Sequence, residues 1–301
     1  MARRTTQDRV VFWSFLTPTL FAFFMVLVVP FVLGVYYSFT TWTGVPGNPI
    51  DWVALANYKA MFKDLRFFYS FGLTALYAVV SMTVVNLLAF GLALLVTQEL
   101  RLKNIYRTGF FLPNLIGGLV LGYIWQFIFN AAIPKVGDMV HWEFLRRSFL
   151  SDPKTAFFAI VFVAAWQYAG YIMMIYIAAL QNVPGELTEA AAIDGANNWQ
   201  RLRHITIPMI APAFTVSSFL TLVNAFKMFD VNVSLTNGMP VSQFLGKSVF
   251  GTELVAMNIY NTAFASNNMA QGQAKAVMFF LVLVIVSLIQ VYFNKKREVE
   301  L

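Results

Sequence analysis

Few residues of this chain have the types and spacing that catalysis requires. The sequence has no cysteine and two histidines, His141 and His204, both of which fall between apolar segments. No HExxH, GxSxG or DxD pattern occurs, so a zinc site or a serine–histidine site would lack its ligands. The inventory argues against an enzyme and predicts no catalytic or metal site.

One fragment is similar to the end of a phosphate-binding loop. Gly246, Lys247 and Ser248 follow one another, but such a loop needs a further glycine five residues before Gly246, where Val241 stands. We therefore expect no nucleotide and no other cofactor to bind this chain, and any ATP hydrolysis to occur in a separate protein.

Polar side chains inside apolar segments offer a different chemistry, the passage of a polar solute. Such groups are costly in a membrane and often mark a pathway, and sugar sites combine hydrogen-bonding groups with aromatic rings. Lys227 and Asp230 would share a helix face and could pair there. Alternatively, the aromatic residues only pack and the charged pair is structural. The candidates are Trp166, Gln167, Tyr171, Asn224, Lys227 and Asp230.

Ser81 and Asn86 are weaker candidates in another apolar segment. Single polar residues commonly serve helix packing. We expect that role for both.

Membrane-spanning helices are the elements that must position these residues. The 301 residues are 59% hydrophobic and 12% charged, against about 25% charged in soluble domains, and the apolar runs exceed the roughly 18 residues that indicate a span. We predict an all-α polytopic membrane protein forming one transmembrane domain over residues 1–301. About six spans are expected, at 11–39, 71–97, 106–130, 155–180, 208–233 and 273–293.

Basic residues predict the orientation of these spans. Eleven Lys and Arg residues fall in the 55 residues of 1–10, 98–107, 181–207 and 294–301, against eight in the 93 residues of 40–70, 131–154 and 234–271. The richer set should be cytoplasmic, which places both termini on the cytoplasmic side of the cell membrane. This distribution explains the net charge of +7 without a nucleic-acid partner. The first apolar run is too long for a signal-peptide core, so we expect it to remain as a span.

The predicted cytoplasmic loop at 181–207 has the features of a short helix. Pro184 suits a first helical turn, the alanines at 190–192 favour helix, and Gly195 can end the helix or permit close approach of another backbone. Two interpretations fit: a hairpin that only joins two spans, or a docking site for a partner.

This loop resembles the signature loop of ABC-importer permeases. The pattern EAA, three residues, G, nine residues, IxLP reads here as Glu189-Ala190-Ala191, Gly195, Ile205, Ile207 and Pro208, with Ile207 where leucine is usual. The tripeptide Asp194-Gly195-Ala196 further resembles the sequence of this loop in the carbohydrate-importer branch of the family. In that family the loop forms a coupling helix in a cleft of the cytoplasmic ATPase. The resemblance implies a coupling role for Glu189, Ala190, Ala191, Asp194, Gly195, Ile205 and Pro208.

Other segments resemble the first permease subunit of maltose- and glycerol-phosphate-type importers. They are Phe111-Leu112-Pro113, Tyr123-Ile124-Trp125, Phe226-Lys227-Met228-Phe229-Asp230, Leu235-Thr236-Asn237-Gly238 and Gly272-Gln273-Ala274. Met239 departs from the family, which has a glycine there. The resemblance implies a type I importer permease that assembles with a second permease, two ATPase copies and an extracytoplasmic sugar-binding protein.

The leading hypothesis is therefore a permease subunit of an ATP-driven importer for a carbohydrate, an oligosaccharide or glycoside. A self-sufficient secondary transporter is an alternative, but it would need ion-coupling carboxylates and usually inverted repeats, and only Asp230 is a suitable acid. A membrane-embedded sugar transferase would need clusters of acidic residues and histidines.

Overall fold

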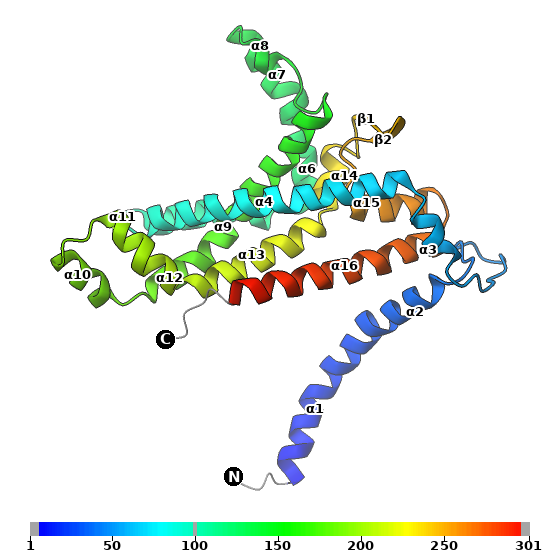
Figure 1. Ribbon diagram of the computed structural model, residues 1–301, viewed down its shortest axis with the longest axis horizontal. Coiled ribbons are helices and arrows are strands. Elements are labelled where there is room, and N and C mark those ends of the chain that lie inside the picture. The colour runs from blue at the N-terminus through cyan, green and yellow to red at the C-terminus, as the bar shows by residue number, and fades with distance from the viewer. Residues whose placement is uncertain (1–5, 99–100, 296–301) are drawn as a thin grey trace. The chain divides into compact units, whose positions relative to one another are not determined.

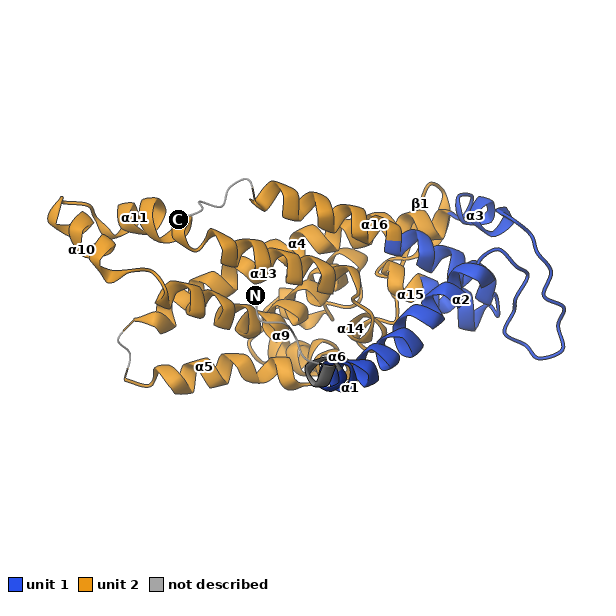
Figure 2. Cartoon of the chain, turned by 90° about the horizontal axis from the view of Figure 1, so that it is seen from below, with its two compact units in different colours: residues 1–64, 259–280 blue, residues 65–258, 281–301 orange. Residues whose placement is uncertain are grey.

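The computed structural model describes residues 6–98 and 101–295, with side chains from Val10 onward. Arg3, Arg4, Lys296 and Arg297, which contribute to the predicted orientation of the termini, lie outside the described residues. The regular secondary structure of the described residues is helical, apart from one short hairpin and an isolated bridge between Thr40 and Trp52 (Figure 1). It forms two compact units, residues 1–64 with 259–280 and residues 65–258 with 281–301 (Figure 2). This division leaves the prediction of one transmembrane domain open.

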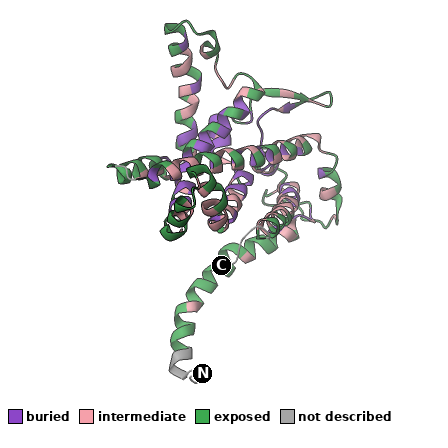
Figure 3. Ribbon diagram, turned by 60° about the vertical axis from the view of Figure 1, so that its left-hand side comes forward, coloured by how far each residue is buried: buried purple, intermediate pink, exposed green. Residues whose placement is uncertain are grey.

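Unit 1 begins with a long apolar helix that continues through two prolines. α1 (Thr6–Phe23), the π-helix η1 (Phe24–Val28) and α2 (Val29–Tyr37) contain the candidate span Val10–Tyr37. The π-helix precedes Pro30, which takes a first-turn position in α2 where its missing N–H is tolerated. The apolar side chains of this helix are nearly all exposed (Figure 3). A helix that is apolar all round requires lipid or another subunit to cover it.

The rest of unit 1 contains a buried lysine that joins three of its segments. It contains α3 (Ala56–Met61), the π-helix η5 (Asn261–Ala265) and the first part of α16 (Met269–Lys295). Lys275, 1% exposed, donates to Asp64 Oδ2 at 2.7 Å and to Thr262 Oγ1 at 2.8 Å. Such pairing offsets the cost of burying the ammonium group.

Unit 2 is built on three packed helices, α4 (Leu65–Thr97), α9 (Pro153–Gln181) and α13 (Ala211–Phe226). Asp152 caps α9 by accepting from the backbone N–H of Lys154 at 3.0 Å, and Pro153 occupies the first turn. Ala89 and Ala93 of α4 belong to the same buried cluster as Ala165 of α9. Small residues at these positions allow two membrane helices to approach closely.

The span predicted at 106–130 is divided in the structure. α5 (Lys103–Phe111) continues into the 3₁₀ helix η2 (Leu112–Leu115), which ends before Ile116. α6 (Gly118–Phe127) then starts a candidate span, Gly118–Met139, with η3 (Ile128–Ala132) and α7 (Ile133–Met139). Pro113 lacks an N–H, and Ile116 and Gly117 are extended. The segment predicted as a span at 106–130 is therefore not one continuous helix in the structure.

The span predicted at 208–233 is interrupted twice. α11 (Asn198–Arg201), η4 (Leu202–Thr206) and α12 (Ile207–Met209) bend by 69° into α13, and a second break at Lys227 separates α13 from α14 (Asp230–Leu235). The described residues thus hold five helices long and apolar enough to cross a membrane, or six if the bent pair is one span. The remaining elements are α8 (Glu143–Arg146), α10 (Gly185–Ile193), β1 (Val241–Phe244), β2 (Lys247–Phe250) and α15 (Val255–Tyr260).

Candidate functional site

The predicted loop helix is present as α10, and its end explains Gly195. Gly195 has φ +83° and donates to Ala192 O at 3.1 Å, while Ala196 N donates to Ala191 O at 2.9 Å. These two bonds form the helix ending that requires a left-handed residue after the cap. A Cβ at Gly195 would meet no atom within 4 Å. Within this chain, therefore, backbone conformation requires the glycine and close packing does not.

A second short helix follows α10, and sequence reasoning missed it. Asn197 Oδ1 accepts from Gln200 N at 2.9 Å, and Gln200 Oε1 accepts from Asn197 N at 2.8 Å, a capping box that starts α11. Asn197 followed three residues later by Gln200 was the signal that could have found it. The helix leads to Ile205 and Pro208, which are half-buried.

The whole loop stands away from the rest of the protein. No described residue from 181 to 209 is buried, and Ile193 is 87% and Trp199 64% exposed. Glu189, Ala190 and Asp194 are exposed as well. A groove of about 490 Å³ separates the loop from the ends of α4 and α9, lined among others by Thr97, Thr188 and Arg201. The geometry gives α10 and α11 an open face on which a partner could bind.

The predicted solute-path residues divide into separate places. Gln167 is buried and donates to Ile116 O at 3.0 Å, so it holds the break before α6. Tyr171 is half-buried against the core of α4 and α9. Asn224 lines a gap of about 10 Å³ with Tyr77 and Thr221, space for about one water molecule.

The predicted pairing of Lys227 and Asp230 is wrong. Lys227 caps the end of α13 and Asp230 begins α14, so the two residues do not share a continuous helix face. Both are exposed, and the ion pairs among the described residues do not join them. Asp230 instead lies beside Gly118, where a Cβ would meet the Asp230 Cβ at 2.8 Å.

Asn86 has the packing role that the sequence suggests for it. Its Nδ2 donates to Thr221 Oγ1 at 2.9 Å, and its Oδ1 accepts from the Tyr176 hydroxyl at 2.8 Å. The Tyr176 hydroxyl also lies 2.6 Å from Ser217 Oγ. The network therefore joins α4, α9 and α13, and no solute is needed to satisfy it.

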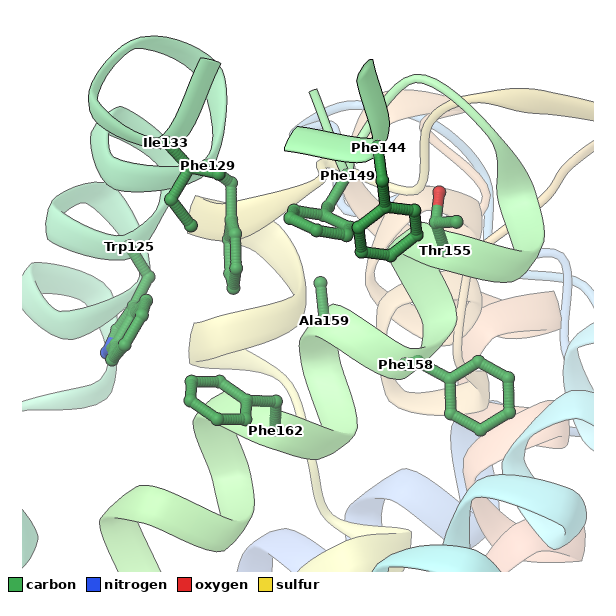
Figure 4. Close-up of a pocket in the computed structure, with 9 residues that line it drawn as sticks. All are labelled: Trp125, Phe129, Ile133, Phe144, Phe149, Thr155, Phe158, Ala159 and Phe162. Carbon is green, nitrogen blue, oxygen red and sulfur yellow. The ribbon is translucent and has the colours of Figure 1, made fainter. Parts of the chain in front are cut away.

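Trp166 borders an aromatic pocket. Its ring contacts that of Trp125 edge-on at 5.5 Å, and Trp125 lines a cavity of about 430 Å³ together with Phe129, Ile133, Phe144, Phe149, Thr155, Phe158, Ala159 and Phe162 (Figure 4). The Thr155 hydroxyl and the Trp125 indole are the polar groups of this lining. A sugar would need more hydrogen-bonding partners than these, so the pocket by itself suits an apolar group.

Long apolar helices, costly polar groups within them and an exposed loop helix define a polytopic membrane transport protein. Residues 86–299 match the family model described as "Binding-protein-dependent transport system inner membrane component". The chain belongs to this family, the inner-membrane permeases of ABC importers, which confirms the resemblance and places the protein in the membrane as a multi-pass transport component.

Individual relatives cover nearly the whole chain. The probable permease for starch degradation products, AmyD, of Thermoanaerobacterium thermosulfurigenes is 45% identical over 295 residues, 98% of this chain and 97% of the relative. The multiple sugar-binding transport permease MsmF of Streptococcus mutans is 31% identical and covers 95% of this chain and 96% of its own.

Solved structures share the fold. A chain of a bacterial ABC transporter that imports the acidic polysaccharide alginate matches with a TM-score of 0.79 at 20% identity, over 96% of each chain. The same TM-score, at 19% identity and equal coverage, is found for that transporter in complex with a periplasmic protein bound to an alginate pentasaccharide. The type I importer permease fold predicted from the sequence is thereby confirmed.

Proposed function

We propose that this permease carries a carbohydrate across the cell membrane, and that the carbohydrate is a short oligosaccharide of glucose derived from starch. The observation that carries the substrate class is the 45% identity with a permease named for starch degradation products, over almost the full length of both chains. The 31% identity with a multiple-sugar permease supports the broader class.

The proposed assembly contains two copies of a cytoplasmic ABC ATPase, which bind and hydrolyse ATP, a second permease and an extracytoplasmic sugar-binding protein. Both termini and the α10 loop are cytoplasmic in this proposal. The loop transmits ATPase movement through Glu189, Ala190, Ala191, Asp194, Gly195, Ile205 and Pro208. Its exposed apolar side chains, Ile193 above all, support a protein contact there because water alone would not favour them.

The solute path is proposed to pass the break after α13. Non-helical backbone at membrane depth is tolerated where it is buried in protein or lines a water-filled cavity, and broken helices often form solute sites in transporters. Lys227 and Asp230 are exposed at this break, and Asn224 of α13 and Tyr171 of α9 are half-buried. Trp166 remains proposed as an aromatic platform, whereas the bond of Gln167 to Ile116 supports a structural role.

Uptake into vesicles tests this function. The complete importer is reconstituted with its cognate binding protein, and labelled maltose, maltotriose and longer maltodextrins are offered with and without ATP. We expect ATP-dependent uptake of at least one glucose oligomer. Uptake of a different sugar alone would replace the substrate class, whereas uptake driven by an ion gradient without ATP would favour a secondary transporter.

A further inference from the structure

The fragment Gly246-Lys247-Ser248 belongs to the tip of the hairpin formed by β1 and β2. Phe244 pairs with Lys247, so Leu245 and Gly246 form a two-residue turn, with φ +47° and +77°. Turns with two positive φ values strongly favour Asn-Gly. Leu245 places a branched apolar side chain in the left-handed region, which is unfavourable for such a residue.

The turn combines an unfavourable backbone conformation with an exposed apolar side chain. Leu245 in the turn is 75% exposed, whereas the other exposed apolar residues of this segment, Val241 at 51% and Met239 at 46%, lie at and before the base of β1. Lys247 is exposed and is the one charged residue in the stretch 241–250. An asparagine at position 245 would suit both the turn and water better, so leucine is favourable there only when a partner covers it.

The base of the hairpin is firmly anchored in unit 2. The Tyr69 hydroxyl donates to Gly251 O at 2.8 Å, and the Tyr69 ring lies 5.4 Å from that of Phe244. The Arg66 guanidinium lies 4.4 Å from the centroid of the Phe250 ring and donates from Nε to the buried Glu253 at 2.6 Å. The turn is therefore presented in a fixed position, which lowers the entropy cost of binding.

The hairpin and the α10 loop lie at opposite ends of α4 (Figure 1). Arg66 and Tyr69 in the first turns of α4 contact the hairpin, whereas Thr97 at its last turn lines the groove beside the loop. The 33 residues of α4 span about 50 Å at 1.5 Å per residue. If α10 faces the cytoplasm, the hairpin is accessible only to a partner outside the cell membrane.

We propose that the hairpin tip is a docking point for the extracytoplasmic sugar-binding protein, with Leu245 as the buried anchor and Lys247 as the charged guide. The surface that it fits is an apolar socket edged by carboxylates. This inference rests on the proposed function and its orientation. A protein partner is favoured over lipid because Gln243, Lys247 and Ser248 are exposed around the leucine, and their polar groups would not enter hydrocarbon.

The test uses the full importer in lipid nanodiscs and the maltodextrin-loaded binding protein carrying a fluorescent label. Leu245→Asn removes the anchor and suits the turn, so we expect an unchanged or higher melting temperature and about tenfold weaker binding, mainly from faster dissociation. Lys247→Glu should slow association, and this effect should shrink in high salt. Leu102→Asn is the matched control, because Leu102 is 53% exposed and caps the start of α5 on the predicted cytoplasmic side, where asparagine is favourable.

Equal affinities for the wild type and Leu245→Asn would overturn the docking point. If the wild-type importer binds no labelled protein and its ATPase is not stimulated, the proposed function itself fails. A solvatochromic dye on Leu245→Cys that reports lipid, together with unchanged affinity, would assign the tip to the bilayer instead.

Discussion

At the residue scale, the conformation of Gly195 decides how α10 ends. Its φ of +83° is open to glycine and, at lower frequency, to asparagine. The family motif identified this position in the sequence, but the motif alone did not say whether the glycine serves backbone conformation or contact. The two hydrogen bonds at the end of α10 show that, within this chain, the glycine serves backbone conformation.

Gly195→Ala should therefore disturb the end of α10, at a cost of about 1 kcal/mol, and lower ATP-coupled sugar uptake severalfold. Gly195→Asn, which tolerates the same φ, should retain most of the uptake. Initial uptake rates and binding-protein-stimulated ATPase activity are the measurements. If both variants lose the same share of uptake, the position excludes any side chain, and the positive φ is not the reason for the glycine.

The Tyr176 hydroxyl is the second residue whose role can be isolated. Tyr176→Phe removes its bonds to Asn86 and Ser217, and we expect the free energy of unfolding to fall by about 0.6 kcal/mol, a typical value for a hydrogen bond within a membrane protein, and by no more than about 1.7 kcal/mol. A double-mutant cycle with Ser217→Ala checks this. Additive effects would contradict a direct coupling between the two hydroxyls.

At the scale of elements, helix pairs approach at glycines. A Cβ at Gly122 of α6 would lie 1.8 Å from Ser234 Oγ of α14, and a Cβ at Gly170 of α9 would lie 1.8 Å from Phe110 O of α5. The second contact is with backbone, so it cannot be relieved by a change of rotamer. The close approach of α5 to α9 thus requires a residue without a side chain at position 170.

Gly170→Ala should lower the stability of the detergent-solubilised protein by about 1–3 kcal/mol. Gly91→Ala in α4 is the matched control, because a Cβ there would meet no atom within 4 Å. That change should be neutral or stabilise the helix by up to about 1 kcal/mol. Melting temperatures measured side by side decide; a Gly170→Ala variant as stable as Gly91→Ala would refute the close approach.

Hydropathy predicted the class and the approximate number of spans because it averages over about 19 residues. The same averaging hides backbone breaks. Pro113 and Gly117 interrupt one predicted span and Lys227 another, and the pairing of Lys227 with Asp230 failed because helical spacing does not continue across a break. The capping box of Asn197 and Gln200, which starts α11, is a short signal that hydropathy averaging does not detect.

At the scale of the whole molecule, the orientation in the membrane can be measured directly because the sequence has no cysteine. Glu186→Cys on α10 and Gln243→Cys on β1 give two exposed positions in one background. In intact cells, a membrane-impermeant maleimide should label Cys at 243 and should label Cys at 186 only after the membrane is opened. The reverse pattern would contradict the proposed orientation, and labelling of both in intact cells would contradict a sealed arrangement.

The buried ammonium group of Lys275 has a consequence for biogenesis. Its carboxylate partner, Asp64, lies 211 residues earlier in the chain. Since an unpaired lysine opposes insertion, the last helix acquires its full preference for the bilayer only when the early segment that carries Asp64 is available to receive it. The segment that carries Asp64 is synthesised long before the segment that carries Lys275, so this contact of unit 1 can form only after both segments have been made.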